Sequence, residues 1–372
     1  MVLSDAGPTR RRAVLAAGAV GGVLAAACAG SGTSGSAGAP KPEALKANIR
    51  FMFFHDQWKD AFDQVIRNFG SKYPNVTVDF ETNPSYIQKV TTELTAGAGP
   101  DVVSVNWDML RTFSQFNYLY DLTPEAAKDK AFAADLAAYH PKIAALMKWE
   151  GKQKGVGLDH DDIAIFWNVS MFKQLQLRPL TEVHDKWTWD DVLDVARKIT
   201  DTSANRFGFH GQNTTGQTGY WSFVYANGGN VLTDDGSKAD PLLDPAALEA
   251  LQWLTDTGVK HGVSPSDAEL RIAVGSTSVA TLFTSGKLGM FVSGSWNVNS
   301  YATAIKDFEW DVAHLPLAPR TGKRSSVLHG TGFGVNRDGH AVDAAVAFIK
   351  HLATRETHHV YGSTGIIQSA RM

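Results

Sequence analysis

The chain has 372 residues, of which 44% are hydrophobic and 20% are charged, and its formal net charge at pH 7 is −3. This length suffices for two domains of ordinary size, each with a sizeable apolar core. The mildly acidic charge balance argues against a nucleic-acid partner, because nucleic-acid-binding domains usually carry a basic face.

An export signal is predicted at the amino terminus. Three arginines at 10–12 precede an uncharged stretch, 13–27, that is rich in Ala, Val, Leu and Gly. A basic region, a short apolar region and small residues at a cleavage site define such a signal, so residues 1–27 are expected to be removed. The apolar stretch is too short to span a bilayer, which takes roughly twenty residues, and no later segment is long and apolar enough. The paired arginines resemble a twin-arginine signal, although a Sec signal can carry arginines too, so both export routes stay open.

The only cysteine of the chain, Cys28, follows this stretch. The letters LAAAC resemble the lipobox of bacterial lipoproteins, in which the cysteine becomes the lipidated first residue of the mature chain. Ala25 stands where the lipobox usually has a large aliphatic residue, with Leu24 one position earlier. The Gly/Ser-rich sequence that follows has the composition of a flexible tether. We therefore expect residues 28–48 to be a lipid anchor and tether.

Strand and helix patterns alternate from residue 49 onward. Buried strands are predicted at 49–54, 75–80 and 101–105, and the segments that follow each of them repeat apolar residues at helical spacing. Such alternation indicates an α/β fold with a parallel sheet and helices on its faces.

Polar and aromatic residues follow each of these three strands. Ligands of parallel α/β sheets bind outside the carboxyl ends of the strands. The candidates are His55, Asp56 and Gln57 after the first strand, Asn83 after the second, and Asn106, Trp107 and Asp108 after the third. Trp58 lies on the apolar stripe of the predicted helix, so a core position and a ligand-facing position are nearly balanced for it.

The second half contains similar elements in a different order. Residues 155–168 form a long strand-like crossing segment, and residues 308–319 form a strand that leads into a proline-rich crossing. Thr188 followed by Asp191 predicts a capped helix start, and Asp244 before a proline predicts another. The pair of histidines at 358–359 is expected on the surface at a helix end.

Several stretches together resemble the extracellular solute-binding proteins of ABC importers, in the maltose-binding-protein-like sugar-binding family. They are FMFFHDQWKDAFDQVIRNFGSKYPNVTVDF, AGAGPDVVSVNWD, IFWNVSMFKQLQLRPL followed by WTWDDVLDVARKIT, LFTSGKLGMFVSGSW, and HGTGFGVNRDGHAVDAAVAFIKHL. Their order and spacing carry the resemblance, which spans most of residues 49–365.

The resemblance implies a type II periplasmic-binding-protein fold. Each of two lobes would be a mainly parallel sheet with flanking helices, and crossing hinge strands would join the lobes. Residues 49–161 with 318–362 would form lobe 1, and residues 162–317 would form lobe 2. In this family some tens of residues usually follow the position of segment 363–372, so this segment is expected to begin a C-terminal part that is truncated or natively short here.

Further ligand-binding candidates come from the chemistry that a sugar requires. Carboxylates and amides bind its hydroxyls, and aromatic rings cover its apolar faces. The resemblance places Asp159 and Asp161 at a lobe crossing, with a solvated turn as the alternative, and it places Trp296 across the cleft. The remaining candidates are Trp221, His329 and the backbone amide of Gly330.

Other functions remain as alternatives. A metal site formed by Asp159, His160 and Asp161 is disfavoured, because no second ligand cluster has recognisable spacing. Asp159 with Asp162 could serve a glycoside hydrolase, but the chain has no P-loop, H-E-x-x-H or G-x-S-x-G motif. The same fold could instead bind a polyamine, a phosphate ester or a chelated metal.

The resemblance thus implies a monomeric, lipid-anchored receptor on the outer face of the cytoplasmic membrane. It would close on a sugar or oligosaccharide and deliver it to the permease of an ABC importer. No catalysis, no cofactor, no bound metal and no nucleic-acid partner are expected.

Overall fold

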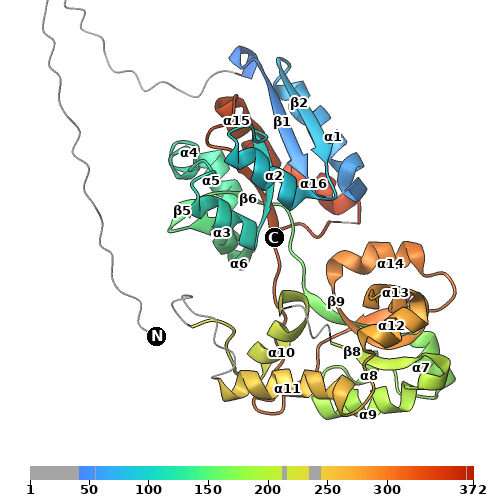
Figure 1. Cartoon of the computed structure of the whole chain (residues 1–372). Helices are drawn as coiled ribbons and strands as arrows, with labels where there is room; N and C mark the ends of the chain where they lie inside the picture. The colour runs from blue at the N-terminus through green and yellow to red at the C-terminus, as the bar shows by residue number, and fades with distance from the viewer. Residues whose placement is uncertain (1–41, 55, 212–215, 234–243, 366) are drawn as a thin grey trace, which may run out of the picture. The chain divides into compact units, whose positions relative to one another are not determined.

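The computed structural model describes residues 42–54, 56–211, 216–233, 244–365 and 367–372 (Figure 1). The predicted export signal, Cys28 and most of the tether lie outside the described residues, and so does the candidate ligand residue His55.

The first sheet has five strands in the order β2-β1-β3-β11-β6. These strands are β1 (Ala47–Phe53), β2 (Val76–Thr82), β3 (Val102–Asn106), β6 (Val156–Gly157) and β11 (Thr331–Val335). β1 pairs in parallel with β2 and β3, whereas β11 runs antiparallel to β3 and β6. The three strands predicted in the first half of the chain are therefore present.

The second sheet has four strands in the order β10-β7-β9-β8. These strands are β7 (Ile163–Asn168), β8 (Phe207–His210), β9 (Leu288–Gly294) and β10 (Trp310–Ala313). β7 is antiparallel to both β9 and β10, and β8 is parallel to β9. A separate hairpin pairs β4 (Lys148–Trp149) with β5 (Lys152–Gln153).

The expectation of mainly parallel sheets is wrong, because both sheets are mixed. The chain returns to the first sheet through β11, whose first residue, Thr331, pairs with the last residue of β3, Asn106. A strand that enters at the carboxyl end of its neighbour must run antiparallel to it. The predicted strand at 155–168 is likewise two strands, β6 in the first sheet and β7 in the second, separated by residues 158–162.

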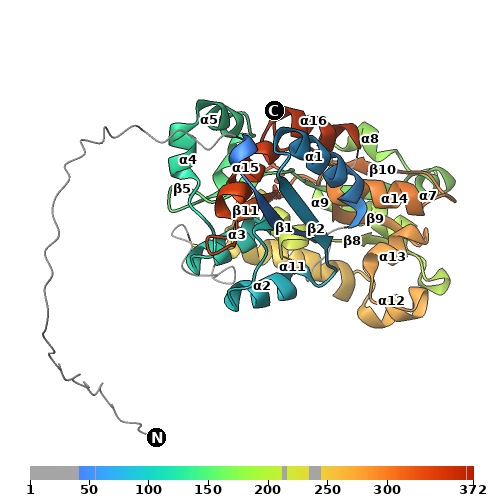
Figure 2. The same ribbon diagram turned by 90° about the horizontal axis from the view of Figure 1, so that it is seen from above.

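Helices cover both sheets, and they form two groups according to their place in the chain. Helical elements before β7 or after β11 are η1 (Pro42–Ala44), η2 (Asp56–Trp58), α1 (Lys59–Lys72), α2 (Tyr86–Thr95), α3 (Trp107–Gln115), α4 (Thr123–Lys128), α5 (Lys130–Ala137), α6 (Pro141–Leu146), α15 (Val342–Leu352) and α16 (Arg355–Ser363). Helices α1 and α16 pack against each other although they come from opposite ends of the chain (Figure 2).

The remaining helical elements lie between β7 and β10. They are α7 (Val169–Gln174), α8 (Leu180–Val183), α9 (Trp189–Ile199), η3 (Thr202–Ala204), η4 (Gly216–Tyr220), α10 (Trp221–Ala226), α11 (Pro245–Val259), α12 (Asp267–Val274), α13 (Val279–Thr284), η5 (Ser295–Asn297) and α14 (Val298–Ala304). The predicted start of α9 is confirmed as a reciprocal capping box between Thr188 and Asp191. The predicted start of α11 is confirmed as well, since the Asp244 carboxylate accepts hydrogen bonds from the amides of Ala246 and Ala247.

Each sheet has a buried apolar cluster on either face. In β1, Phe51 and Phe53 belong to one cluster and Met52 to another, as expected when successive side chains point to opposite faces. Trp58 is 5% exposed, and its ring centroid lies 5.1 Å from that of Phe53. Trp58 is therefore a core residue.

Within the ranges that the structure covers, no helix combines the length and the apolar character needed to cross a membrane.

Candidate ligand-binding site

A cavity of about 500 Å³ opens at the carboxyl ends of β1, β2 and β3. Its lining residues follow these strands in the chain: Phe54 after β1, Pro84, Ser85, Tyr86, Ile87 and Gln88 after β2, and Asn106 and Met109 at the β3–α3 junction. The cavity thus occupies the edge at which parallel α/β strands present ligand-binding groups.

Most of the polar residues predicted at this edge hold its loops in place. The Asp56 carboxylate accepts a hydrogen bond from the Thr82 hydroxyl and so connects the ends of β1 and β2. The Asn83 side chain accepts from the Ser85 amide at 2.8 Å, and Asn106 caps α3 by accepting from the Met109 amide at 3.1 Å. Of these predicted residues only Asn106 lines the cavity, while Asp56 and the neighbouring Gln57 are exposed.

A pair of tryptophans joins α3 to the start of α10. The Trp107 indole Nε1 donates to Gln217 Oε1 at 2.9 Å, and the ring centroids of Trp107 and Trp221 are 5.7 Å apart. A Cβ on Gly216 would lie 2.4 Å from the Trp221 Nε1, so glycine is needed where η4 passes this ring. Gln217 is not among the predicted site residues, although the Gly and Thr residues around it signal a closely approaching backbone.

A second group of candidate residues converges where the chain crosses between the sheets. The Ser295 hydroxyl donates to Asp161 Oδ1 at 2.7 Å. The backbones of Asp161 and His329 exchange two hydrogen bonds, at 3.1 and 2.8 Å. The ring of Trp296 meets the ring of His329 edge to face, with centroids 5.0 Å apart. Three segments that are distant in the sequence, at residues 161, 295–296 and 329, therefore contact one another and place polar and aromatic side chains together.

Gln217 connects the two groups. Its side chain accepts from Trp107, and its backbone influences the pKa of His329. Burial lowers the pKa of His329, against the opposing effects of the Gln217 backbone and of the charges of Asp162 and Asp108. A neutral imidazole at pH 7 offers one donor and one acceptor nitrogen, which suits a hydroxyl-bearing ligand.

Two carboxyl groups at the crossing are perturbed by burial. Asp159 is 2% exposed and accepts from the Thr331 amide at 2.7 Å. Burial and the neighbouring Asp161 together raise the pKa of Asp159 to about 8. Burial also raises the pKa of Asp161, although the Ser295 hydroxyl stabilises its charged form.

The structure brings some of the predicted residues together and separates others. Six of them form a connected group through direct contacts or mutual electrostatic influence: Trp107, Asp108, Asp161, Trp221, Trp296 and His329. Asp159 instead holds the Thr331 backbone, and Gly330 is buried where a Cβ would lie 2.8 Å from Ile143 Cδ1. Asp56, Gln57 and Asn83 belong to the neighbouring strand-end loops.

Several solved substrate-binding proteins superpose on this chain. An ABC substrate-binding protein of Listeria monocytogenes in complex with cycloalternan superposes with a TM-score of 0.77 at 24% identity, covering 88% of this chain and 80% of that chain. The GacH receptor of Streptomyces glaucescens, studied unliganded and with acarbose, gives a TM-score of 0.69 at 20% identity, covering 88% and 81%. The chain therefore has the type II periplasmic-binding-protein fold, with mixed sheets.

Residues 64–367 match the family model of the bacterial extracellular solute-binding proteins, and the chain belongs to this family. Among curated relatives, one named as a binding protein in Brucella abortus (strain 2308) is 24% identical over 273 residues, which cover 71% of this chain and 61% of the relative. The maltotriose-binding protein of Pyrococcus abyssi is 20% identical over 265 residues, which cover 70% and 52%. The chain thus spans between half and two thirds of the length of these relatives.

Proposed function

We propose that this protein is the substrate-binding component of an ABC importer and that it captures a sugar or oligosaccharide. Residues 49–161 with 318–362 would form one lobe and residues 162–317 the other. The group of Trp107, Trp221 and Trp296 with its polar neighbours carries the proposal. The cycloalternan and acarbose complexes of the structural neighbours support the same ligand class.

The chemistry of this group fits a sugar. Trp221 and Trp296 pack on the apolar core of the second sheet but stay partly exposed, so each ring has one supported side and one accessible part. Such rings add large apolar contact area at little entropic cost. Asp161, Ser295 and Gln217 supply oxygens and an amide for hydroxyl groups. A buried polar site rejects ligands that leave these groups unpaired.

The location of the site suggests how binding reaches the transporter. Trp107 follows a strand of the first sheet, whereas Trp221 and Trp296 belong to helical elements of the second. A ligand that contacts Trp107 together with Trp221 and Trp296 stabilises the conformation in which all three tryptophans reach it. In two-lobed binding proteins such a conformation is reached by hinge closure. The closed form would then be recognised by the membrane permease of the importer.

The test is ligand binding by calorimetry and by the shift of the melting temperature. Maltotriose, cycloalternan, acarbose and D-tagatose form the panel, because structural neighbours and curated relatives bind or are named for them. Saturation at a hundred times the dissociation constant stabilises the folded state by about 2.7 kcal/mol, which a melting curve resolves. We expect Trp296→Ala to weaken sugar binding at least tenfold, roughly 1.4 kcal/mol.

Trp149→Ala is the matched control, since Trp149 lies in the β4–β5 hairpin beside Arg111 and not among the site residues. Equal affinity losses in the two variants would contradict the assignment of Trp296. Binding of only polyamines, phosphate esters or metal chelates would replace the proposed ligand class. The family is described as one of solute-binding proteins, so we expect no hydrolysis. Release of reducing ends from an oligosaccharide would favour a hydrolase instead.

We also propose export and lipid anchoring through Cys28, with the protein acting as a monomer on the outer face of the cytoplasmic membrane. This part rests on the basic–apolar–cysteine order of the first 28 residues. Metabolic labelling with a fatty acid should mark the wild-type chain and spare Cys28→Ser. Labelling of both chains, or of neither, would overturn it.

A further inference from the structure

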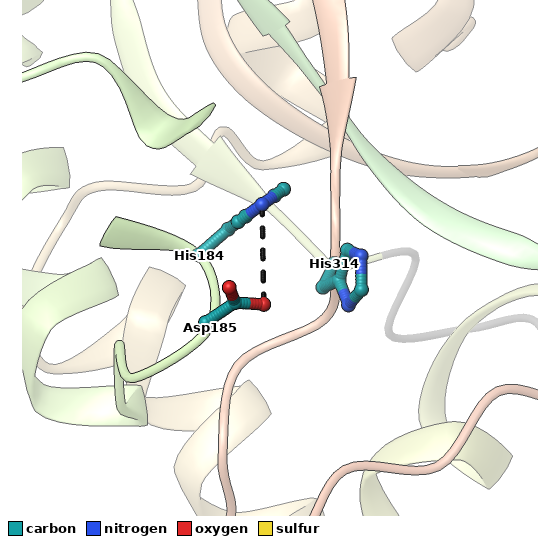
Figure 3. A group of neighbouring side chains, drawn as sticks. All are labelled: His184, Asp185 and His314. Carbon is teal, nitrogen blue, oxygen red and sulfur yellow. Dashed lines mark ion pairs between the residues drawn. The ribbon is translucent and has the colours of Figure 1, made fainter. Parts of the chain in front are cut away.

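Two histidines and an aspartate, none of them among the candidate ligand-binding residues, form a cluster (Figure 3). His184 is the C-cap residue of α8, Asp185 follows it, and His314 directly follows β10. One potential ligand atom from each residue lies within 4.8 Å of the others. The His184 Nε2 is 4.0 Å from an Asp185 carboxylate oxygen, and the two imidazole centroids are 4.5 Å apart.

We propose that His184, Asp185 and His314 form a binding site for a divalent transition-metal ion of the Zn²⁺ type. Imidazole nitrogen suits zinc, nickel and copper, whereas magnesium and calcium prefer sites built entirely of oxygen. Three protein ligands leave a fourth position for water, which is the composition of many open zinc sites.

The backbone on both sides of this cluster is fixed by hydrogen bonds. The Trp187 indole donates to the carbonyl of His314 at 3.0 Å, and the Leu317 amide donates to the carbonyl of Trp187 at 2.9 Å. The Arg324 guanidinium donates to the carbonyl of Asp185 at 2.6 Å. These bonds attach the turn after α8 to the segment after β10, so the two halves of the site are held next to each other without a metal.

The side chains themselves can still adjust. Ligand atoms on one zinc ion are separated by roughly 3.4 Å, given bond lengths of about 2.1 Å in a tetrahedron. The Asp185 side chain is 79% exposed and His314 is exposed, so rotation of these two closes the remaining distance. The Arg324 guanidinium, which donates to the Asp185 carbonyl, is a nearby positive charge that opposes a cation.

The cluster is also reachable from solvent. Asp185 lines a cavity of about 720 Å³ with Val183 and Trp187, which gives a hydrated ion a route to the cluster.

The experiment is a calorimetric titration of the untagged full chain with Zn²⁺ after removal of metal by EDTA. We expect one saturable zinc site per chain, which Mg²⁺ and Ca²⁺ do not occupy. The double variant His184→Ala/His314→Ala should lose at least a hundredfold in zinc affinity. His340→Ala removes an exposed histidine outside the cluster and should leave the affinity unchanged.

Asp185→Ala keeps the test decisive should the double variant fold poorly, because this exposed side chain can be removed without disturbing the bond from Arg324 to the backbone. It should weaken zinc binding about tenfold and leave the melting temperature of the metal-free protein unchanged. Zinc binding of wild-type strength in either variant, or no saturable binding to the wild-type chain, would overturn the proposal.

Discussion

Asp159 shows what a single buried carboxyl group contributes at the crossing between the sheets. Its folded-state pKa of about 8 is far above its ordinary value of 3.8, because burial and the nearby Asp161 disfavour the charged form. Between these two pH values the folded protein keeps a proton that the unfolded chain has lost. The free energy of unfolding therefore falls as the pH rises from about 4 to about 8, and the loss is complete above that range.

Replacing Asp159 with Asn should remove this pH dependence. The Asn side-chain oxygen can still accept from the Thr331 amide, so the turn is retained. One pKa unit corresponds to about 1.4 kcal/mol, so we expect Asp159→Asn to be more stable than the wild type by several kcal/mol at pH 8. Near pH 4 the two proteins should be equally stable. Urea unfolding at pH 4, 6 and 8 measures the difference.

The exposed neighbour Asp162 provides the control, since Asp162→Asn leaves the buried carboxyl in place. A constant stability difference between Asp159→Asn and the wild type at all three pH values would show that the carboxyl is not the titrating group.

At the scale of single elements, helix caps are where sequence and stability are most directly connected. The Thr188 hydroxyl accepts from the Asp191 amide at 3.3 Å, and the Asp191 carboxylate accepts from the Thr188 amide at 2.7 Å. Removing the hydroxyl leaves a helix amide without its partner. Thr188→Ala should lower the free energy of unfolding by about 1 kcal/mol.

Ser85 is the N-cap residue of α2 but makes no capping hydrogen bond through its side chain, so Ser85→Ala should cost much less. Denaturant unfolding of both variants makes the comparison. Similar losses in the two variants would mean that the hydroxyl of Thr188 does not stabilise α9 through its cap.

Local patterns of this kind explain which elements the sequence could predict. The strand β1, the helix α1 and the caps of α9 and α11 follow from periodicity and from short-range hydrogen bonding. The antiparallel direction of β11 could not be predicted, because it depends on where the chain re-enters the first sheet. Among site residues, Trp107 follows from its place after a strand, whereas Gln217 acts through a contact 110 residues away in the chain.

At the scale of the whole molecule, the end of the chain covers a residue that the sequence placed at the surface. The expectation for the first of the two histidines at 358–359 is wrong, since His358 is 4% exposed. Its Nδ1 is 2.8 Å from the Ser369 hydroxyl, and Ser369 pairs through its backbone with Asp159. The terminal residues thus connect α16 to the crossing between the sheets, a contact that helical periodicity cannot reveal.

This coverage makes His358 sensitive to acid. Burial, followed by the charge of Arg371, lowers its pKa from 6.5 to about 4. Burial has the same effect on His210, whose pKa also falls to about 4. Below pH 6.5 the unfolded chain binds protons at both histidines and the folded protein does not. The contribution of these two histidines to the free energy of unfolding is therefore fully present above pH 6.5 and is lost as the pH falls toward 4.

The two histidines and Asp159 together predict a maximum of stability near pH 6.5. Of these three groups, only Asp159 reduces stability as the pH rises above 6.5. Below pH 6.5 the two histidines together outweigh Asp159 by about 1.4 kcal/mol per pH unit. His358→Gln removes one histidine, so the difference in melting temperature between this variant and the wild type should shrink from pH 7 to pH 5. The exposed His359→Gln should follow the wild-type profile. A profile that rises steadily from pH 6 to pH 8 in the wild type would contradict this balance, because it would require Asp159 to be ionised in the folded protein.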